Sequence, residues 1–288
     1  MGLPLFLVDL LLASCNGDFS KSAMQSMQHN RAKDNKPSTS SASPNAKSQE
    51  NITVLDVNEQ KFDITNVQNI TALDVSARKL DMPNVQIIAD LQNLTQLDIS
   101  KNNLGVAGAQ EIARLLNLTQ LNISKNKLEV AGARAIAKLQ KLTHLDISDN
   151  KLEIAGAQEI AKLQKLVYLN ISGNGLVTVA AQAIATLQDL TYLDISSNHF
   201  GVGAAQEIAK LQKLTHLDVS GGNHLGATAP QEIAKLQKLI CLNLSNNNLG
   251  ASGPQEIVKL QERGIVVILS GRGFPHNLAY GQCHFFNK

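Results

Sequence analysis

Rings and carboxylates recur in this sequence at a spacing of 24 residues, and such side chains can bind metals, move protons or contact a partner. In four consecutive copies a ring stands two positions before an aspartate or asparagine, and a serine follows two positions later. The rings are His144, Tyr168, Tyr192 and His216, and the carboxylates are Asp146, Asp194 and Asp218. Their chemistry depends on how the chain brings them together.

A metal site is not expected from these groups. If each copy supplies one strand of a sheet, His144 and His216 lie three strands apart, which is about 14 Å. Zinc ligands sit about 2 Å from the ion, so these two histidines cannot share one. His216 and Asp218 give two ligands at best, and the three cysteines form no spaced cluster. The sequence therefore predicts no metal site and no cofactor.

Hydrolytic catalysis is not expected either. The serines fill one column of the repeat, which indicates a structural role rather than a single nucleophile. The glycines of SGRGF, residues 270–274, lack a phosphate-loop pattern. We therefore predict that the protein is not an enzyme. A catalytic alternative would require an activity that disappears with His216→Ala or Asp218→Ala.

The spacing of these groups comes from an internal repeat that covers residues 51–269. The nine copies begin at Asn51, Asn69, Asn93, Asn117, Lys141, Lys165, Asp189, Lys213 and Lys238. The first copy is short, and the copy from Lys213 carries an extra glycine at Gly221 or Gly222. Gln60 and Arg78 replace an asparagine that the later copies share, so the first two copies are expected to be capping units.

Each copy predicts one strand and one short helix. The segment LxxLDIS alternates apolar and polar residues, as a half-buried strand does. The shared asparagine follows it, where a buried amide can bond the backbone of a turn. The segment AGAQEIAKLQ has the spacing of an amphipathic helix. One such unit cannot bury its own apolar sides, so the copies must stack into a solenoid with a parallel sheet. Helices are wider than strands, and we therefore expect a curve with the strands inside.

The pattern LxxLDISxNxLxxxGAxxIAxL resembles a leucine-rich repeat and is most similar to the ribonuclease-inhibitor-like class, although units of that class are usually longer. The resemblance covers about three quarters of the chain. It implies an α/β horseshoe, with the parallel sheet on the concave face and short helices on the convex face. It also implies protein binding, and it supplies no catalytic residue.

The predicted protein-binding site lies within two columns of side chains on the strands, and it consists of His144, Tyr168, Tyr192, His216, Asp146, Asp194 and Asp218. The variable column precedes the shared leucine, and it reads Val54, Ala72, Gln96, Gln120, His144, Tyr168, Tyr192, His216 and Cys241. The aspartate column follows that leucine, and it reads Asp56, Asp74, Asp98, Asn122, Asp146, Asn170, Asp194, Asp218 and Asn243. Tyrosine is favoured at interface centres, and a ladder of carboxylates attracts a basic partner. Alternatively, the rings only cover strand backbone, and the aspartates belong to the repeat itself.

The N-terminal region predicts a membrane anchor and a tether. Residues 1–15, MGLPLFLVDLLLASC, have the apolar centre of a signal peptide, and LASC resembles the bacterial lipobox, which implies lipidation of Cys15. Residues 16–50 are polar and predict a disordered tether. Asp9 and the lack of a preceding basic residue favour the alternative, a short N-terminal segment of a cytosolic protein.

Composition and charge limit the class of molecule that the protein is expected to bind. The formal net charge is only +2, and basic and acidic residues are interleaved, so a nucleic-acid partner is not expected. We predict a monomeric bacterial surface lipoprotein, held to the membrane only by its lipid, that binds a protein, with a host protein as one candidate. The alternative is a cytoplasmic or secreted effector or inhibitor, similar in fold to ribonuclease inhibitor and Ran GTPase activators, that acts by masking a partner protein.

The C-terminal end predicts a closing strand and a cap. In ERGIVVILSG the polar columns disappear, and Ile265 is expected in the variable column and Val267 in the aspartate column. The aromatic tail, residues 270–288, is expected to cover this strand, because open apolar edges invite aggregation. An exposed contact site is the alternative function of the tail.

Overall fold

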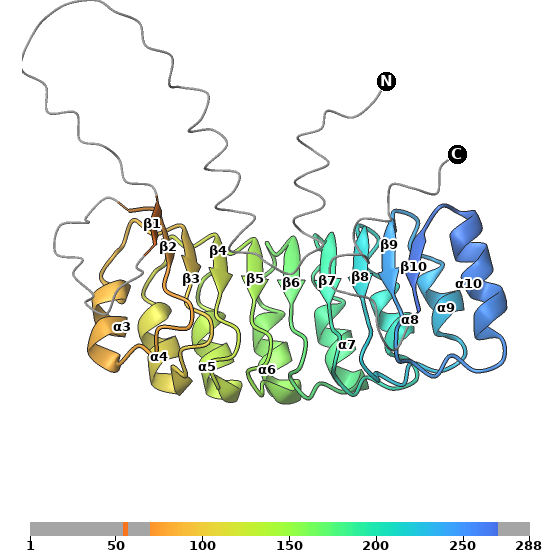
Figure 1. Ribbon diagram of the computed structural model, residues 1–288, viewed down its shortest axis with the longest axis horizontal. Coiled ribbons are helices and arrows are strands. Elements are labelled where there is room, and N and C mark those ends of the chain that lie inside the picture. The colour runs from red at the N-terminus through yellow and green to blue at the C-terminus, as the bar shows by residue number, and fades with distance from the viewer. Residues whose placement is uncertain (1–53, 57–69, 270–288) are drawn as a thin grey trace, which may run out of the picture.

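The chain forms a single parallel sheet in which every strand comes from a successive repeat. The structure is a computed structural model, and it describes residues 54–56 and 70–269. Within these ranges ten strands pair in sequence order, from β1 to β10 (Figure 1). The strands are β1 (Val54–Asp56), β2 (Ala72–Asp74), β3 (Gln96–Asp98), β4 (Gln120–Asn122), β5 (His144–Asp146), β6 (Tyr168–Asn170), β7 (Tyr192–Asp194), β8 (His216–Asp218), β9 (Cys241–Asn243) and β10 (Val266–Ile268).

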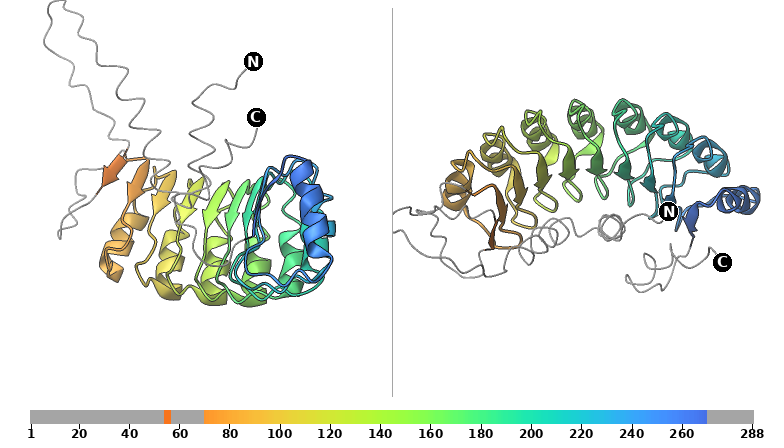
Figure 2. Two further views of the ribbon diagram at one scale, coloured as in Figure 1. Left: turned by 45° about the vertical axis from the view of Figure 1, so that its right-hand side comes forward. Right: turned by 90° about the horizontal axis from the view of Figure 1, so that it is seen from above.

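A helix follows each strand from β2 to β9 and packs beside the helix of the next unit. The helices are α3 (Met82–Ala89), α4 (Gly105–Ile112), α5 (Glu129–Ile136), α6 (Glu153–Ile160), α7 (Thr178–Ile184), α8 (Ala204–Ile208), α9 (Ala229–Ile233) and α10 (Gly253–Glu262). Figure 2 shows the described units as an arc, with the strands on its inner side and the helices on its outer side. The expected solenoid, with a concave sheet and convex helices, is therefore confirmed.

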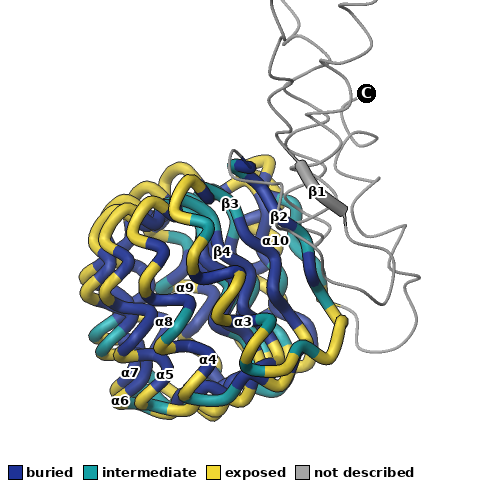
Figure 3. The backbone as a smooth tube through the Cα atoms, turned by 90° about the vertical axis from the view of Figure 1, so that its left-hand side faces the viewer, coloured by how far each residue is buried: buried dark blue, intermediate teal, exposed yellow. Residues whose placement is uncertain are grey.

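The core is aliphatic and continuous between the sheet and the helices. The shared leucines of β2 to β9 are all buried, and so are the β-branched or aliphatic residues two positions later. Viewed along the stack, the buried segments line the inside of the coil (Figure 3). Because each unit covers its neighbour, the interior forms one hydrophobic cluster that runs from Ile70 to Ile265.

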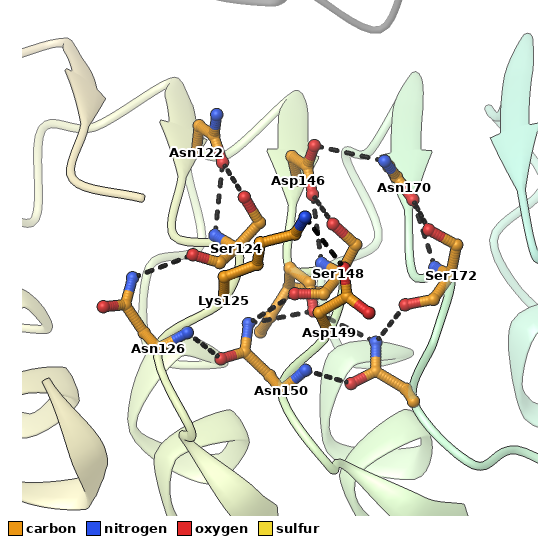
Figure 4. Close-up of polar contacts among 12 residues, drawn as sticks. Asn122, Ser124, Lys125, Asn126, Asp146, Ser148, Asp149, Asn150, Asn170 and Ser172 are labelled. Atoms are coloured by element: carbon orange, nitrogen blue, oxygen red, sulfur yellow. Dashed lines mark hydrogen bonds and ion pairs between the residues drawn. The ribbon is translucent and has the colours of Figure 1, made fainter. Parts of the chain in front are cut away.

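A ladder of buried asparagines holds the turn after each strand (Figure 4). The Nδ2 group of Asn126 donates to the backbone oxygen of Ile99 in the preceding unit at 2.9 Å. It also donates to the backbone oxygens of Ile123 and Ser124, both at 3.1 Å. Its Oδ1 accepts from the backbone N–H of Asn102 at 2.9 Å. The predicted role of the asparagine column is confirmed, because these amides satisfy backbone groups that the turn leaves unpaired.

The helices are placed differently from the prediction. In the unit from Lys141, the segment 155–164 was expected to be helical throughout, but α6 begins two residues earlier and ends at Ile160. Beyond it, the Leu163 N–H bonds the oxygen of Ile160 at 3.0 Å, and the Gln164 side chain bonds the oxygen of Ala161 at 2.6 Å. These short-range bonds form a turn that directs Leu163 into the core, where it is buried.

The register of the closing strand is one residue away from the prediction. Val267 was expected in the aspartate column, but Ile268 lies there, paired with Asn243. Ile265 was expected in the variable column, but its N–H bonds the oxygen of Leu260 at the end of α10 at 3.2 Å. The strand therefore starts one residue later, and Ile265 enters the core instead.

The extra glycine interrupts the asparagine ladder. Gly221 and Gly222 both have positive φ, 80° and 81°, a conformation that favours glycine. In the next unit Asn247 still donates to the oxygen of Val219 at 2.8 Å. Its Oδ1 is buried without a hydrogen-bond partner among the described residues. In a regular unit this oxygen accepts from the backbone N–H of the asparagine one unit earlier, as Asn126 Oδ1 does from Asn102. We infer that the inserted glycine moves the corresponding N–H away from Asn247.

Several predictions concern residues outside the described ranges. They are the signal-like segment 1–15 with Cys15, the tether 16–50, the tail 270–288, and the capping residue Gln60. These predictions, and the boundaries of the repeat region at 51 and 269, stay predictions. Among the helices of the described residues, none is both long and apolar enough to cross a bilayer.

Candidate binding face

Four rings of the variable column form a continuous stack across the concave sheet. His144, Tyr168, Tyr192 and His216 come from β5 to β8, and in-register parallel pairing places them directly beside one another. The two tyrosine rings are 4.3 Å apart between centroids and nearly parallel, with 14° between their planes. The histidines flank them at 6.0 Å and 6.2 Å. We call these four residues the ring stack, and its members are the rings that the sequence singled out.

Threonines fix the imidazoles at both ends of the ring stack. Thr143 Oγ1 lies 2.9 Å from His144 Nδ1, and Thr215 Oγ1 lies 3.0 Å from His216 Nδ1. Each hydroxyl also donates to the backbone oxygen of the threonine one unit earlier. Sequence analysis missed these threonines, although the recurring LTH and LTY triplets place one before three of the four rings.

The ring stack is more enclosed than the sequence led us to expect. Tyr168 is only 6 % exposed, whereas the other three rings are half-buried. Tyr168 and Tyr192 each have a ring on both sides, and this stacking covers the faces of both tyrosine rings. Because Tyr168 is the most buried ring, it acts mainly as a support, and the contact surface of the stack comes mainly from Tyr192 and the histidines.

The aspartate column alternates hydrogen-bond acceptors and donors along the sheet (Figure 4). Asn122 Nδ2 donates to Asp98 at 2.9 Å, and Asn170 Nδ2 donates to Asp146 at 3.1 Å. An amide between two carboxylates replaces charge repulsion with a hydrogen bond. From Asp74 to Asn243, each aspartate or asparagine also accepts from the backbone N–H two residues later, as Asp146 does from Ser148 at 3.0 Å. The serine column is therefore structural, as expected.

Asp146 is less accessible than a contact residue should be. It was predicted to face a partner, but it is only 5 % exposed. The Ser148 hydroxyl donates to its Oδ1 at 2.7 Å, and Asn170 occupies its Oδ2. Burial raises the pKa of Asp146 to about 6, against the effect of the bonds from Ser148. The sheet itself satisfies this carboxylate.

The alternation fails in two places. At β2 and β3 Asp74 is paired with Asp98, and at β7 and β8 Asp194 is paired with Asp218, with no asparagine between them. Burial, followed by the charge of Asp218, raises the pKa of Asp194 to about 7. Burial also raises the pKa of Asp218, although Asn243 donates to its Oδ2 at 2.8 Å. Two carboxylates at this spacing do not readily ionise together.

A hollow lies on the concave face beside this carboxylate pair. It is open to solvent on one side, and the space between its atoms, open solvent included, is about 330 Å³. Its wall combines the C-terminal end of the ring stack with the ends of the two columns, and includes Tyr192, His216, Asp218, Cys241, Asn243 and Ile268. Sequence analysis named the first three and missed the others, because the hollow depends on how β9 and β10 close the sheet.

The arrangement offers recognition chemistry rather than an obvious reactive group. Burial lowers the pKa of His144 and of His216, so both imidazoles favour the neutral form. Both ring Nδ1 atoms contact threonine rather than a serine nucleophile. Within residues 70–269 no three His, Cys, Asp or Glu side chains are grouped as metal ligands would be. The ring stack and the carboxylates form a surface that can contact a partner.

The sequence matches family models of the leucine-rich repeat along most of the described region. Models described as "Leucine rich repeat" match residues 116–176 and 164–225, and further leucine-rich repeat models match residues 90–113 and 238–260. Together these matches cover more than half of the chain. No curated protein matches the sequence significantly.

Solved structures share this fold. An internalin (inlF) from Listeria monocytogenes is 21 % identical with a TM-score of 0.58, over 76 % of this chain and 62 % of that one. An internalin C2 (inlC2) from the same species is 23 % identical with a TM-score of 0.53, over 70 % and 82 %. The plant peptide hormone receptor RGFR1, in complex with RGF2, is 25 % identical with a TM-score of 0.51, over 70 % and 32 %. This chain thus spans less than two thirds of inlF and about a third of the plant receptor.

Proposed function

We propose that this chain, which belongs to the leucine-rich repeat family, is a non-catalytic module that binds a protein partner on the concave face of its sheet. The ring stack is the observation that carries the proposal. Its rings are held in register by backbone pairing and by threonine contacts, so little side-chain entropy is lost when a partner binds. A rigid aromatic surface of this kind is typical of interface hot spots.

The repeat class is the second part of the proposal. We assign the units to the ribonuclease-inhibitor-like class of leucine-rich repeats. Support comes from the helix that follows every strand from β2 to β9, on the outer side of the arc. Strands and helices alternate as that class is expected to do, although most units here have only 24 residues.

The partner is expected to be a protein or peptide with basic side chains. Asp194 and Asp218 stand beside the ring stack and attract positive charge. The same carboxylates repel phosphates, which disfavours a nucleic-acid partner. A related fold binds a peptide hormone in the plant receptor RGFR1, so an extended segment of a partner is a plausible ligand for this face. A host protein is one candidate source of that segment.

A pull-down with the purified full chain tests the role of the ring stack. We expect the wild type to capture a partner that the double variant Tyr168→Ala/Tyr192→Ala no longer captures. The matched control is Val179→Ala/Val202→Ala, which changes two exposed residues of the same two units outside the strands. Capture that is equal in all three proteins would contradict a binding role for the rings.

The location of the protein is a separate part of the proposal. We propose that Cys15 is lipidated and that residues 16–50 present the repeat domain at a bacterial surface. The lipobox-like LASC supports this location, and two of the structural neighbours are bacterial internalins. Metabolic labelling with a palmitate analogue in a bacterial host should mark the wild type and not Cys15→Ser. An unlabelled wild type would favour a cytoplasmic or secreted protein.

A further inference from the structure

The hydrophobic core is uncovered at its C-terminal end, where β10 and α10 close the arc (Figure 2). From β2 to β9 the shared leucines are at most 3 % exposed, and the residues two positions later are at most 2 % exposed. In the last unit Val267 and Leu269 take these two positions, and they are half-buried and 45 % exposed respectively. On the helix side, Val258 takes the place of alanines that are buried from Ala89 to Ala209, and it is 51 % exposed. We call Val258, Val267 and Leu269 the end face.

The backbone at this end of the sheet is open as well. The Val266 N–H donates to the oxygen of Ile240, and the Leu244 N–H donates to the oxygen of Ile268, both at 2.9 Å. Alternate residues of a strand bond to opposite sides, so Val267 directs its N–H and C=O away from β9. No described strand lies beyond β10. Sheet edges are usually protected by charged residues or proline, and β10, with the sequence VVI, has neither.

The residues that follow the end face are suited to cover it. Residues 270–288 contain no acidic residue and four aromatic residues, which are Phe274, Tyr280, Phe285 and Phe286. Gly271 and Gly273 allow the chain to reverse its direction after Leu269. A segment of the same chain has an effective concentration of about a millimolar, far above that of a second copy or of a partner protein in dilute solution. The chain's own tail is therefore the occupant that the end face favours.

We propose that residues 274–288 cover the end face, with aromatic side chains packed on Val258 and Leu269 and an extended stretch of backbone hydrogen-bonded to Val267. Such a stretch satisfies the open N–H and C=O groups and removes the apolar surface from water. It also blocks the edge by which two copies would pair end to end. This contact is separate from the concave face, so it does not depend on the proposed function.

Hydrogen exchange of the peptide that contains β10, measured by mass spectrometry on the purified full chain, tests the backbone contact. The comparison is a tail variant in which Phe274, Tyr280, Phe285 and Phe286 are all changed to serine. We expect the peptide to take up deuterium more slowly in the wild type, because the Val267 amide exchanges at least about tenfold more slowly when it is bonded. Equal exchange in the two proteins would overturn the proposal and leave the end face to a partner protein. Slow exchange that is lost when the wild type is diluted would also overturn it, because a second copy would then be the cover.

Variants of the end face locate the contact. Chymotrypsin cleaves after aromatic residues, so its rate of cleavage within residues 270–288 reports whether those residues are covered. Val258→Ser should speed this cleavage about tenfold, the factor that burial of one valine side chain supplies. Leu269→Ser should act in the same direction. The matched control is Val179→Ser on α7, where a valine is also 51 % exposed but lies three helices before α10.

The control should be cleaved at the wild-type rate. Circular dichroism spectra identical to that of the wild type show that each variant is folded. Wild-type cleavage rates in both Val258→Ser and Leu269→Ser would refute the contact with the end face.

Discussion

Asp194→Asn should stabilise the repeat domain at neutral pH and leave its stability nearly unchanged in mild acid. Burial and the neighbouring Asp218 raise the pKa of Asp194 from 3.8 to about 7. A raised pKa in the folded state means that the folded protein holds this proton more tightly than the unfolded chain does. The stability that the proton supplies is fully present below pH 3.8 and is lost as the pH rises through about 7.

The size of the effect follows from the same shift. One pKa unit corresponds to about 1.4 kcal/mol, so a rise from 3.8 to about 7 is worth at most about 4 kcal/mol. Asp194 is half-buried, and solvent relaxation reduces this to about 2 kcal/mol. Asparagine cannot ionise, so the variant removes the repulsion within the pair. The asparagines of this column donate to the preceding unit, as Asn122 does to Asp98, so no new bond to Asp218 is expected.

Urea unfolding of wild type and variant at pH 4.5, 6 and 8, followed by far-UV circular dichroism, measures this difference. Histidines with lowered pKa act in the opposite sense, because the stability they give is lost as the pH falls below 6.5. They are present in both proteins and largely cancel in the comparison. The control is Asp189→Asn, whose carboxylate is about half exposed and pairs with Lys213 on the surface. It should change stability by less than about 1 kcal/mol at every pH.

Two outcomes would refute the reasoning about Asp194. If Asp194→Asn gives no gain in the free energy of unfolding at pH 8, then the carboxylate pair does not strain the sheet. If the gain is the same at pH 4.5 and pH 8, then it does not come from the loss of a charge.

Three further substitutions and one titration test the packing and the rings. Asn150→Ala removes the bonds of the side-chain amide to its own unit and to the preceding unit, and it should cost about 4 kcal/mol in urea unfolding. Asn247→Ala should cost only about 1 kcal/mol, because the Oδ1 of Asn247 has no partner in the described region. Leu145→Ala opens a cavity in the buried leucine column and should cost about 3 kcal/mol by the same method. The NMR titration of His216 should show a midpoint below 6.5, because burial lowers its pKa, and a midpoint above 6.5 would contradict this effect of burial.

The sequence alone was enough to predict the sheet, because a repeat forces equivalent residues into register. Once Leu145 and Leu169 occupy the same column, pairing of their strands brings His144 beside Tyr168 without further information. Helix ends were predicted less well. They depend on local competition, as where the Gln164 side chain caps the oxygen of Ala161 and ends the helical path. Propensity summed over a segment does not resolve such competition.

The candidate site was also predictable only in part: the positions of its residues follow from the repeat, but their burial and the hollow do not. The rings could be named from the sequence because they differ from the glutamines in the same column. The enclosure of Tyr168 and of Asp146 could not be named, because it depends on how closely neighbouring side chains pack on the inner side of a curve. The hollow was also missed, because β10 starts one residue later than expected and brings Ile268 into the aspartate column.

In a stack of equivalent units, a departure from the pattern marks where selection or drift has acted on one unit rather than on all. The aspartate column alternates acceptor and donor from Asp98 to Asp194, and each amide removes the repulsion of its neighbours. A single asparagine at position 218 would donate to Asp194, as Asn170 donates to Asp146. The chain instead keeps two adjacent carboxylates beside the ring stack, and Asp218 lines the hollow. Asp74 and Asp98 form a similar pair, but only Asp194 and Asp218 lie beside the ring stack, so under the proposed function a cation of the partner gains most there.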